Sequence, residues 1–493
     1  MFYSHAILIF SLICLIISAK FFFDEKYEKS LLFVFILGLV LRVFISSDSY
    51  LHDWDEKYHA LVAKNLMSHF FIPTLYDNPV LPYDFTNWTS NHIWLHKQPM
   101  SLWIISLSLK VFGVSEFAVR IPSILFSSMC ILFTYHIASN LTNKKVALLS
   151  AFFVSINGLV IELTGGRVAT DHVDIAFLFF IELSIVFSIV YSKNKLTLFN
   201  LLTGVFIGAA ILSKWLPALV VLPIWLILIG NSGKFNSREI FIQFVVLILT
   251  ILIVCLPWQI YIHYTFPKEA YWETSFNLRH FNEVIENQTG SYFYFIDKIR
   301  INYGELIYLP LVWFIVNIFK KPYQINHFAL LVWFLIPLIF FSLAKTKMQA
   351  YLLFASPAFF IITAYFAVFL IQLKNTKFKY FQYVVASIII LTPIRYCIER
   401  LKPYQKNNSK MELTASIKNL KQKNFTSKDL FFNCNYPIEV MFYTNATAYR
   451  DIPDAKTIQN LIEKGYHLYI NKNDKIKNDF EKLNGVSLID LGF

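Results

Sequence analysis

The chain has 493 residues, of which 56% are hydrophobic, 18% aromatic and only 15% charged. A soluble domain would carry about 25% charged residues, and the mean hydropathy of this chain is +0.51. This composition excludes an ordinary soluble protein and predicts a polytopic membrane protein.

The charges and the cysteines exclude further classes of function. The formal net charge is +12, but the basic residues are spread over short loops and a tail, without the contiguous run that follows a phosphate backbone. Nucleic acid is therefore not an expected partner. Of the five cysteines, four lie in or beside apolar runs and Cys434 stands alone in the polar tail. This pattern predicts neither a disulfide framework nor a paired-cysteine metal site.

Twelve apolar runs have the length of a membrane helix or nearly so. A bilayer core of about 30 Å takes roughly 20 apolar residues per helix. The runs cover residues 5–23, 30–46, 117–139, 146–162, 172–191, 197–212, 216–230, 239–262, 303–319, 326–343, 351–371 and 379–397. The first run lacks a basic flank and a small-residue cleavage site, so we expect a retained helix. The predicted fold class is an all-α polytopic membrane protein with about 12 transmembrane helices.

The positions of lysine and arginine predict the orientation of these helices. If every run crosses the membrane once, five basic loops fall on one side, at residues 144–145, 193–195, 234–238, 320–321 and 374–379. Short basic loops mark the cytoplasmic side. The extracytoplasmic side then receives residues 47–98 and the whole C-terminal tail.

Two segments outside the twelve runs complete the predicted organisation. Met100–Val114 is a helix-length apolar stretch that we expect at the outer surface, because another crossing here would reverse all later loops. From about Leu401 the charged residues and Asn increase, and helix-like segments alternate with strand-like runs. The strand-like runs are 429–432, 467–470 and 486–489, and the helix-like segments are 411–421 and 454–464.

This organisation predicts two domains. Residues 1–400 would form the transmembrane domain, with the outer loop 47–98 carrying the catalytic residues. Residues 401–493 would form a small α/β domain outside the membrane.

Polar side chains gather in four separated stretches that this topology assigns to the outer face. They are Asp53, Asp55 and Glu56; His96 and Lys97; Arg167, Asp171, His172 and Asp174; and Lys345 and Lys347. Carboxylates and ammonium groups at one membrane face suit a reaction between an anionic lipid and an acceptor hydroxyl or amine. A carboxylate would act as the base, and the cations would hold a phosphate. Asp53, His96 and Arg167 are expected substrate contacts within these stretches.

The acidic stretch also has a structural explanation. Asp53 followed by Glu56, ahead of an amphipathic helix, matches an N-terminal capping box. Asp55 is harder to explain in this way, because Asp53 already accounts for the cap.

The other stretches have structural explanations as well. Thr170 or Asp171 could cap the helix that follows. Lys97 and Lys347 could be anchors whose side chains reach the lipid headgroups.

Five motifs of this chain resemble a known superfamily of membrane enzymes. They occur in the order DEKYHALVAKNL, HKQPMSLWIISLSLKVFGVSEFAVRIPS, TGGRVATDHVDIAFLFF, GAAILSKWLPALVVLP and FSLAKTKMQAYLLFASPAF. Their order and spacing, over about residues 30–370, resemble the dolichyl-phosphate-mannose protein mannosyltransferase-like superfamily. The bacterial branch that contains the lipid A aminoarabinose transferase is the most similar. The resemblance implies a C-type glycosyltransferase that takes a sugar from a polyprenyl-phosphate carrier.

The resemblance also implies roles for the acidic residues and the first lysine. Asp55 would be the catalytic base, with Glu56 supporting it, and Asp171 would be a second catalytic acidic residue. Lys97 would bind the donor phosphate, although Lys97-Gln98-Pro99 stands where the superfamily has Lys-Pro-Pro.

Later motifs supply further substrate-binding residues by the same resemblance. Lys214 matches the Leu-Thr-Lys-Gly-Pro segment, here Leu-Ser-Lys-Trp-Leu-Pro, and Lys347 with Tyr351 matches a Lys-x-x-x-Tyr motif near the lipid phosphate. The expected partners are a polyprenyl-phosphate-linked sugar, membrane lipids, and a lipid, glycan or protein acceptor. The expected location is a bacterial inner membrane, with the active site on the periplasmic face.

Three alternatives remain open from the sequence. No cofactor is expected, but Asp55 and Asp171 could share a divalent ion, because hard carboxylate oxygens bind such ions. A membrane transporter of a lipid or glycan would place ionisable residues in the middle of its helices, and Arg42 and Glu182 are the two such residues here. A ligase of lipid-linked oligosaccharides is the third alternative.

Overall fold

The computed structural model describes residues 2–320, 325–373, 379–401, 408–420, 424–472 and 485–489. Its internal contacts divide the chain into two compact units. Unit 1 comprises residues 1–47 and 123–404, and unit 2 comprises residues 48–122 and 405–493. The tail therefore shares a unit with the segment that contains the predicted catalytic loop. The division into domains 1–400 and 401–493 stays a prediction.

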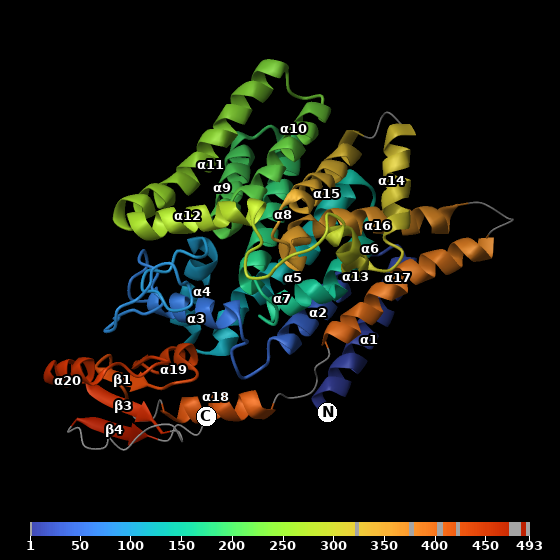
Figure 1. Cartoon of the computed structure of the whole chain (residues 1–493). Helices are drawn as coiled ribbons and strands as arrows, with labels where there is room; N and C mark the ends of the chain where they lie inside the picture. Colours follow the sequence, from blue (N-terminus) through green and yellow to red (C-terminus); the bar gives the residue numbers. More distant parts are fainter. Residues whose placement is uncertain are drawn as a thin grey trace. The chain divides into compact units, whose positions relative to one another are not determined.

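Unit 1 consists of helices, most of them apolar (Figure 1). Their bounds are α1 Phe2–Phe23, α2 Tyr27–Ile45, α6 Lys144–Ile156, α7 Gly158–Thr164, α8 Asp171–Asn194, α9 Thr197–Lys214, α10 Val221–Asn231, α11 Ser237–Thr265, α12 Pro267–Asn282, α13 Tyr294–Tyr303, α14 Tyr308–Lys320, α15 Ile325–Leu343, α16 Ser356–Gln372 and α17 Lys379–Leu401. Short 3₁₀ helices precede α10 and α16, at Leu216–Val220 and Gln349–Ala355. Helix α5, Glu116–Leu141, begins in unit 2 and continues through unit 1.

Eight of the twelve apolar runs each lie within one α-helix, with at most one residue outside it, whereas four are divided between two helices, namely 146–162, 216–230, 303–319 and 351–371. Among the described residues, eight helices are long and apolar enough to cross a membrane, and the number rises to ten if each of two bent helix pairs forms one crossing. One of these pairs is α6 and α7, which meet at 49°. The bend occurs because Asn157 ends α6 and its side chain caps α7, accepting a hydrogen bond from the Val160 amide at 3.0 Å. The protein is a multi-pass membrane protein, as predicted.

Unit 2 contains a small α/β fold and two further helices. Helices α3 (Asp55–Asn65) and α4 (Pro99–Phe112) come from the segment before α5, and Pro99 begins α4 at a position that needs no amide donor. The tail supplies α18 (Asn408–Leu420), α19 (Pro437–Tyr443) and α20 (Ala455–Glu463). The helix expected at Met100–Val114 is thus confirmed as α4.

A four-stranded parallel sheet forms the centre of the tail (Figure 1). Its strands are β1 Asp429–Phe432, β2 Thr447–Ala448, β3 His467–Asn471 and β4 Val486–Ile489, in the order β2-β1-β3-β4. Leu430 pairs with Leu468, which pairs in turn with Val486. Parallel strands require crossover connections, and α19 and α20 provide those after β1 and β2. The predicted α/β composition of the tail is confirmed.

One hydrophobic core joins the two parts of unit 2. Leu61 and Trp94, from the segment before α5, are buried in the same cluster as Phe431 and Phe442 of the tail. Since the two parts pack together, they lie on the same side of the membrane, and the chain between them makes an even number of crossings. From α5 onward, the described residues contain seven single helices and two bent helix pairs that are long and apolar enough to cross a membrane, and one shorter apolar helix, Leu216–Asn231. The predicted topology counts each of these ten as one crossing.

Candidate functional site

The predicted catalytic loop leads into α3 through a strained residue. Trp54 occupies the N-cap position with φ 67° and ψ −135°, a conformation that is costly for a residue with a side chain. The N-cap residue is thus Trp54 and not Asp53, and it makes no side-chain cap hydrogen bond. The capping-box interpretation of Asp53 and Glu56 is therefore wrong. Asp53 instead forms an ion pair with Lys410 of the tail.

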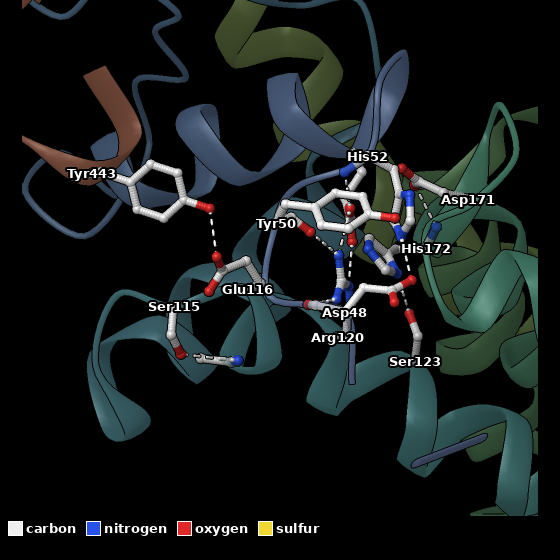
Figure 2. A network of polar contacts seen from close by, with 12 residues as sticks. Asp48, Tyr50, His52, Ser115, Glu116, Arg120, Ser123, Asp171, His172 and Tyr443 are labelled. Carbon is white, nitrogen blue, oxygen red and sulfur yellow. Dashed lines mark hydrogen bonds and ion pairs between the residues drawn. The ribbon is translucent and has the colours of Figure 1, made fainter. Parts of the chain in front are cut away.

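Glu56 and Arg120 form a buried ion pair. Both side chains are fully buried, and Arg120 donates from Nε to Oε1 of Glu56 at 2.7 Å and from Nη2 to Oε2 at 2.9 Å. The same guanidinium donates to the carbonyls of Asp48 at 2.5 Å and Tyr50 at 2.6 Å (Figure 2). The amide of His52 donates to Glu56 at 2.6 Å. This network fixes the backbone of residues 48–52 immediately before Asp55, which favours a supporting role for Glu56.

Asp55 has a different environment from its neighbour. Its side chain is 10% exposed, and the Lys97 ammonium, 20% exposed, lies 4.0 Å from Oδ2. This separation exceeds hydrogen-bond length, so the two groups form a long ion pair. The structure therefore brings together the predicted base, Asp55, and the predicted phosphate ligand, Lys97. Asp55 is the first residue of α3, and Lys97 lies two positions before the start of α4.

An aromatic cluster surrounds the predicted substrate residue His96. The His96 ring stacks on Trp88 with centroids 4.6 Å apart and an angle of 4°, and Trp94 meets it edge-on at 5.7 Å. Tyr58 of α3 contacts Trp88 at 4.9 Å. Burial, assisted by the Glu439 charge, raises the pKa of Tyr58 to about 12. Tyr58 is therefore a neutral hydroxyl near physiological pH, suited to hydrogen bonding.

A second polar group lies within unit 1. Lys214, the last residue of α9, forms an ion pair with Asp174 of α8, whose carboxylate also accepts from Thr170 Oγ1. The Lys214 ammonium lies 5.1 Å from the centre of the Tyr351 ring. The structure thus joins three of the sequence motifs through Asp174, Lys214 and Tyr351.

The predicted acidic residue Asp171 begins α8 after an unusual turn. Thr170 is the N-cap residue, as one structural alternative expected, but it has φ 70° and its hydroxyl bonds to Asp174. Asp171 itself has φ 25° and is fully buried, and it accepts a hydrogen bond from the His172 amide. His172 Nδ1 lies 2.8 Å from Ser123 Oγ (Figure 2). Strained backbone of this kind collects at functional sites.

Lys347 binds backbone carbonyls at the C-terminal end of α15 through its ammonium. It is 3% exposed, and its ammonium donates to the carbonyls of Phe341, Ser342 and Ala344 at 3.2, 2.8 and 2.6 Å. Burial, and then the charge of Lys345, lowers the pKa of Lys347. A lysine at the C-terminus of a helix compensates the carbonyl dipoles there. This arrangement favours a structural role for Lys347, while Lys345 is exposed.

The remaining predicted residues are placed as follows. Arg167 is half-buried, and its amide donates to the Glu162 carbonyl at 3.0 Å. Asp53, Asp55, Glu56, His96 and Lys97 belong to unit 2, whereas Arg167, Asp171, Lys214, Lys347 and Tyr351 belong to unit 1. In the described ranges no three His, Cys, Asp or Glu side chains gather into a metal site.

The sequence analysis missed the role of Arg120. A charged residue inside an apolar helix rarely occurs without a partner, and this signal was present in the run 117–139. The partner Glu56 lies 64 residues earlier, so only the structure could identify the pair.

The two ionisable residues that favoured a transporter are buried in unit 1. Arg42 donates to Ser127 Oγ at 2.9 Å and to the carbonyls of Gly38, Val154 and Ser155 at 2.9 to 3.1 Å. Glu182 accepts from Thr134 Oγ1 at 3.0 Å. Arg42 thus donates four hydrogen bonds that join three helices, so the transporter alternative is not favoured.

Comparisons with known proteins agree with this architecture. Residues 96–261 match the family model described as dolichyl-phosphate-mannose-protein mannosyltransferase. An uncharacterized protein of Aquifex aeolicus is 27% identical over 341 residues, which cover 68% of this chain and 63% of the relative. An undecaprenyl phosphate-alpha-4-amino-4-deoxy-L-arabinose arabinosyl transferase of Pseudomonas paraeruginosa is 26% identical over 289 residues, covering 54% and 49%. The chain therefore spans between about half and two thirds of the length of these relatives.

Solved structures share the fold over most of both chains. ArnT from Cupriavidus metallidurans, bound to undecaprenyl phosphate, has a TM-score of 0.59 and 12% identity, covering 90% of this chain and 88% of that one. The oligosaccharyltransferase of Archaeoglobus fulgidus has a TM-score of 0.53 and 12% identity, covering 88% and 68%. The predicted resemblance is confirmed: this chain has the C-type glycosyltransferase fold and is similar to the dolichyl-phosphate-mannose-protein mannosyltransferases and the bacterial aminoarabinose transferases.

Proposed function

We propose that this protein is an integral-membrane glycosyltransferase that moves a sugar from a polyprenyl-phosphate carrier to an acceptor. The observation that carries the proposal is the approach of Lys97 to Asp55 at 4.0 Å, at the start of a helix in a C-type glycosyltransferase fold. The names of the relatives support a polyprenyl-phosphate donor, since one is an arabinosyl transferase for undecaprenyl phosphate-linked aminoarabinose and one structure holds undecaprenyl phosphate.

The chemistry that we propose is a single displacement. The acceptor oxygen or nitrogen forms a bond to the anomeric carbon while the bond from that carbon to the phosphate oxygen breaks, which inverts the configuration. Asp55 takes the proton of the acceptor, a contribution of about 10²- to 10⁴-fold in rate. Lys97 stabilises the negative charge that grows on the departing phosphate.

The surrounding residues would prepare this pair for reaction. The Arg120–Glu56 network would hold residues 48–52, so that Asp55 keeps one position as substrate binds. His96 and Tyr58 would contact the sugar or the acceptor through hydrogen bonds. The roles of Asp53, Arg167, Asp171, Lys214, Lys347 and Tyr351 stay predictions from sequence resemblance, as does a shared divalent ion.

The location of the reaction follows from the proposed topology. The basic loops assign unit 2 to the extracytoplasmic side, so we place the reaction on the periplasmic face of a bacterial inner membrane. The acceptor would be a lipid, a glycan or a protein at that face.

Transfer of a labelled sugar tests the proposal. Membranes containing the native chain, or Asp55→Asn at matched expression, would receive a panel of radiolabelled polyprenyl-phosphate sugars, with total membrane extract as acceptor. Label should move to a product with the native chain and not with Asp55→Asn. The proposal fails if no donor of the panel yields product, or if both chains transfer equally. Asp451→Asn, an exposed aspartate of the tail, is the matched control.

A further inference from the structure

Unit 2 contains a pocket, and 13 of its 16 lining residues lie outside the five sequence motifs. It has a volume of about 550 Å³, within the range of roughly 300 to 1,000 Å³ for small-molecule sites. One wall comes from residues 61–78 and the other from residues 424–447, so both belong to the same compact unit.

The pocket has a polar and nearly uncharged lining. Of its 16 lining residues, nine carry a side-chain hydroxyl or amide, among them Asn65, Asn78 and Asn445. Hydroxyl and amide groups can each donate and accept hydrogen bonds, and neighbouring sugar hydroxyls need both kinds of partner. Five apolar residues of the lining, including Leu61 and Met441, could cover the apolar faces of sugar rings.

The two charged lining residues are already engaged by the protein. Lys64 donates to the Met441 carbonyl at 2.7 Å and also to the Thr444 carbonyl, which ties the two walls together. Asp77 accepts from Thr74 Oγ1 at 3.0 Å and lies 4.0 Å from His69. Because the lining has one charge of each sign and both charges already have partners in the protein, the pocket does not favour an anionic or a cationic ligand.

Other polar groups of the pocket are available to a ligand. Asn445 and Ser427 are exposed, and the described part of the chain offers neither side chain a hydrogen-bond partner. Both side chains belong to loops that the hydrophobic core and the Lys64 bonds hold in place. They can therefore form hydrogen bonds to a ligand without breaking bonds within the protein.

Helix α3 connects this pocket to the proposed reaction site. Asp55 is its first residue, whereas Lys64 and Asn65 at its last turn line the pocket. Ten residues of α-helix separate Asp55 from Asn65, a distance of about 15 Å. A chain of several sugars could thus occupy the pocket while its reacting end meets Asp55.

We propose that this pocket, formed by the end of α3 and the tail segment 424–447, binds an uncharged glycan portion of the acceptor. The link to the acceptor rests on the proposed function, whereas glycan binding itself is an independent property of the pocket. The proposal gives the tail domain a role in choosing the acceptor.

Direct binding to the full-length protein in detergent tests the proposal. The probes would be uncharged trisaccharides (maltotriose, cellotriose and chitotriose), with trigalacturonate and a neutral tripeptide for comparison, measured by saturation-transfer NMR and calorimetry. At least one uncharged trisaccharide should bind the native chain, and Asn445→Trp, which adds a bulky indole to the pocket lining, should weaken this binding at least tenfold. Asn460→Trp, an exposed residue of α20 outside the pocket, should bind as the native chain does.

The outcomes separate this inference from the transferase proposal. Absence of binding by every uncharged probe, a preference for trigalacturonate or the tripeptide, or equal binding by Asn445→Trp would overturn the inference. Thermal unfolding would verify that Asn445→Trp is folded, and Asn445→Ala, with a smaller loss of affinity, is the milder variant. Sugar transfer without trisaccharide binding would refute only the glycan pocket, and binding without any transfer would refute only the transferase.

Discussion

Two neighbouring carboxylates at the start of α3 have opposite environments. Glu56 is fully buried and accepts three hydrogen bonds from Arg120 and the His52 amide. Asp55 retains some exposure and faces Lys97 at 4.0 Å. A buried carboxylate whose hydrogen bonds are satisfied stabilises one backbone conformation, whereas a partly accessible one beside a cation can meet a substrate. Burial and hydrogen bonding thus distinguish the supporting carboxylate, Glu56, from the proposed catalytic one, Asp55, whereas residue type alone does not.

The largest expected effect comes from exchanging these two carboxylates for amides. Asp55→Asn should lower kcat for sugar transfer by about 10²- to 10⁴-fold, because the base is lost, and should leave the Tm nearly unchanged. Glu56→Gln should instead lower the Tm, because a buried arginine loses its counter-charge. Transfer assays and thermal unfolding of both purified variants measure the contrast. Equal losses of Tm in the two variants would contradict it.

Replacement of Arg120 tests whether the buried Glu56–Arg120 pair stabilises the protein. Arg120→Leu leaves Glu56 buried without its cation, which typically costs about 3 to 5 kcal/mol. The double variant Glu56→Leu/Arg120→Leu should be less destabilised than the sum of the two single variants. The free energies of unfolding of all four proteins measure the coupling. Additive effects would show that Glu56 and Arg120 do not stabilise the protein as a pair.

Two lysines separated by one residue extend the comparison to unit 1. Lys347→Met should destabilise the protein by about 1 to 3 kcal/mol, because two carbonyls in the last turn of α15 and the Ala344 carbonyl just after it lose their donor. Lys345→Met is the matched control and should leave the Tm unchanged, since Lys345 is exposed. If Lys347→Met keeps the Tm and raises only KM for the donor, the phosphate-binding role predicted from sequence is correct.

The smallest expected effect concerns a tyrosine that bonds to the first residue of α5. Tyr443 donates to Glu116 at 2.6 Å (Figure 2), and burial, then the Glu116 charge, raises its pKa above the ordinary value of 10.0. Because the unfolded state loses this proton first, the stabilisation is complete below about pH 10 and is lost as the pH rises further. Tyr443→Phe should therefore show a smaller fall of Tm than the native chain between about pH 9 and pH 11. Parallel curves for the two proteins would contradict this assignment.

Much of the fold could be predicted because membrane helices are defined by local composition. Every apolar run is largely helical, and the three strand-like runs of the tail became β1, β3 and β4 within a residue of their predicted bounds. The two-residue strand β2, Thr447–Ala448, carries too little pattern to be recognised. The break at Asn157 was missed because apolar residues continue on both sides of it.

The candidate site was predictable only in part. The sequence supplied the residue types, and the motif resemblance selected Asp55 and Lys97, which the structure places 4.0 Å apart. The capping box failed because hydrogen bonds to Lys410 and Arg120 outweigh the local pattern at Asp53 and Glu56.

The sequence by itself determined that this chain is a multi-pass membrane protein with an α/β tail, because hydrophobicity and periodicity act over a few neighbouring residues. Tertiary structure decided which charges are bound and which remain accessible. Arg120, Lys410 and Lys64 find their partners 64, 357 and 377 residues away, and no local pattern encodes contacts of that range. The packing of the tail against residues 48–122, and the polar pocket that this packing creates, follow from the same long-range contacts.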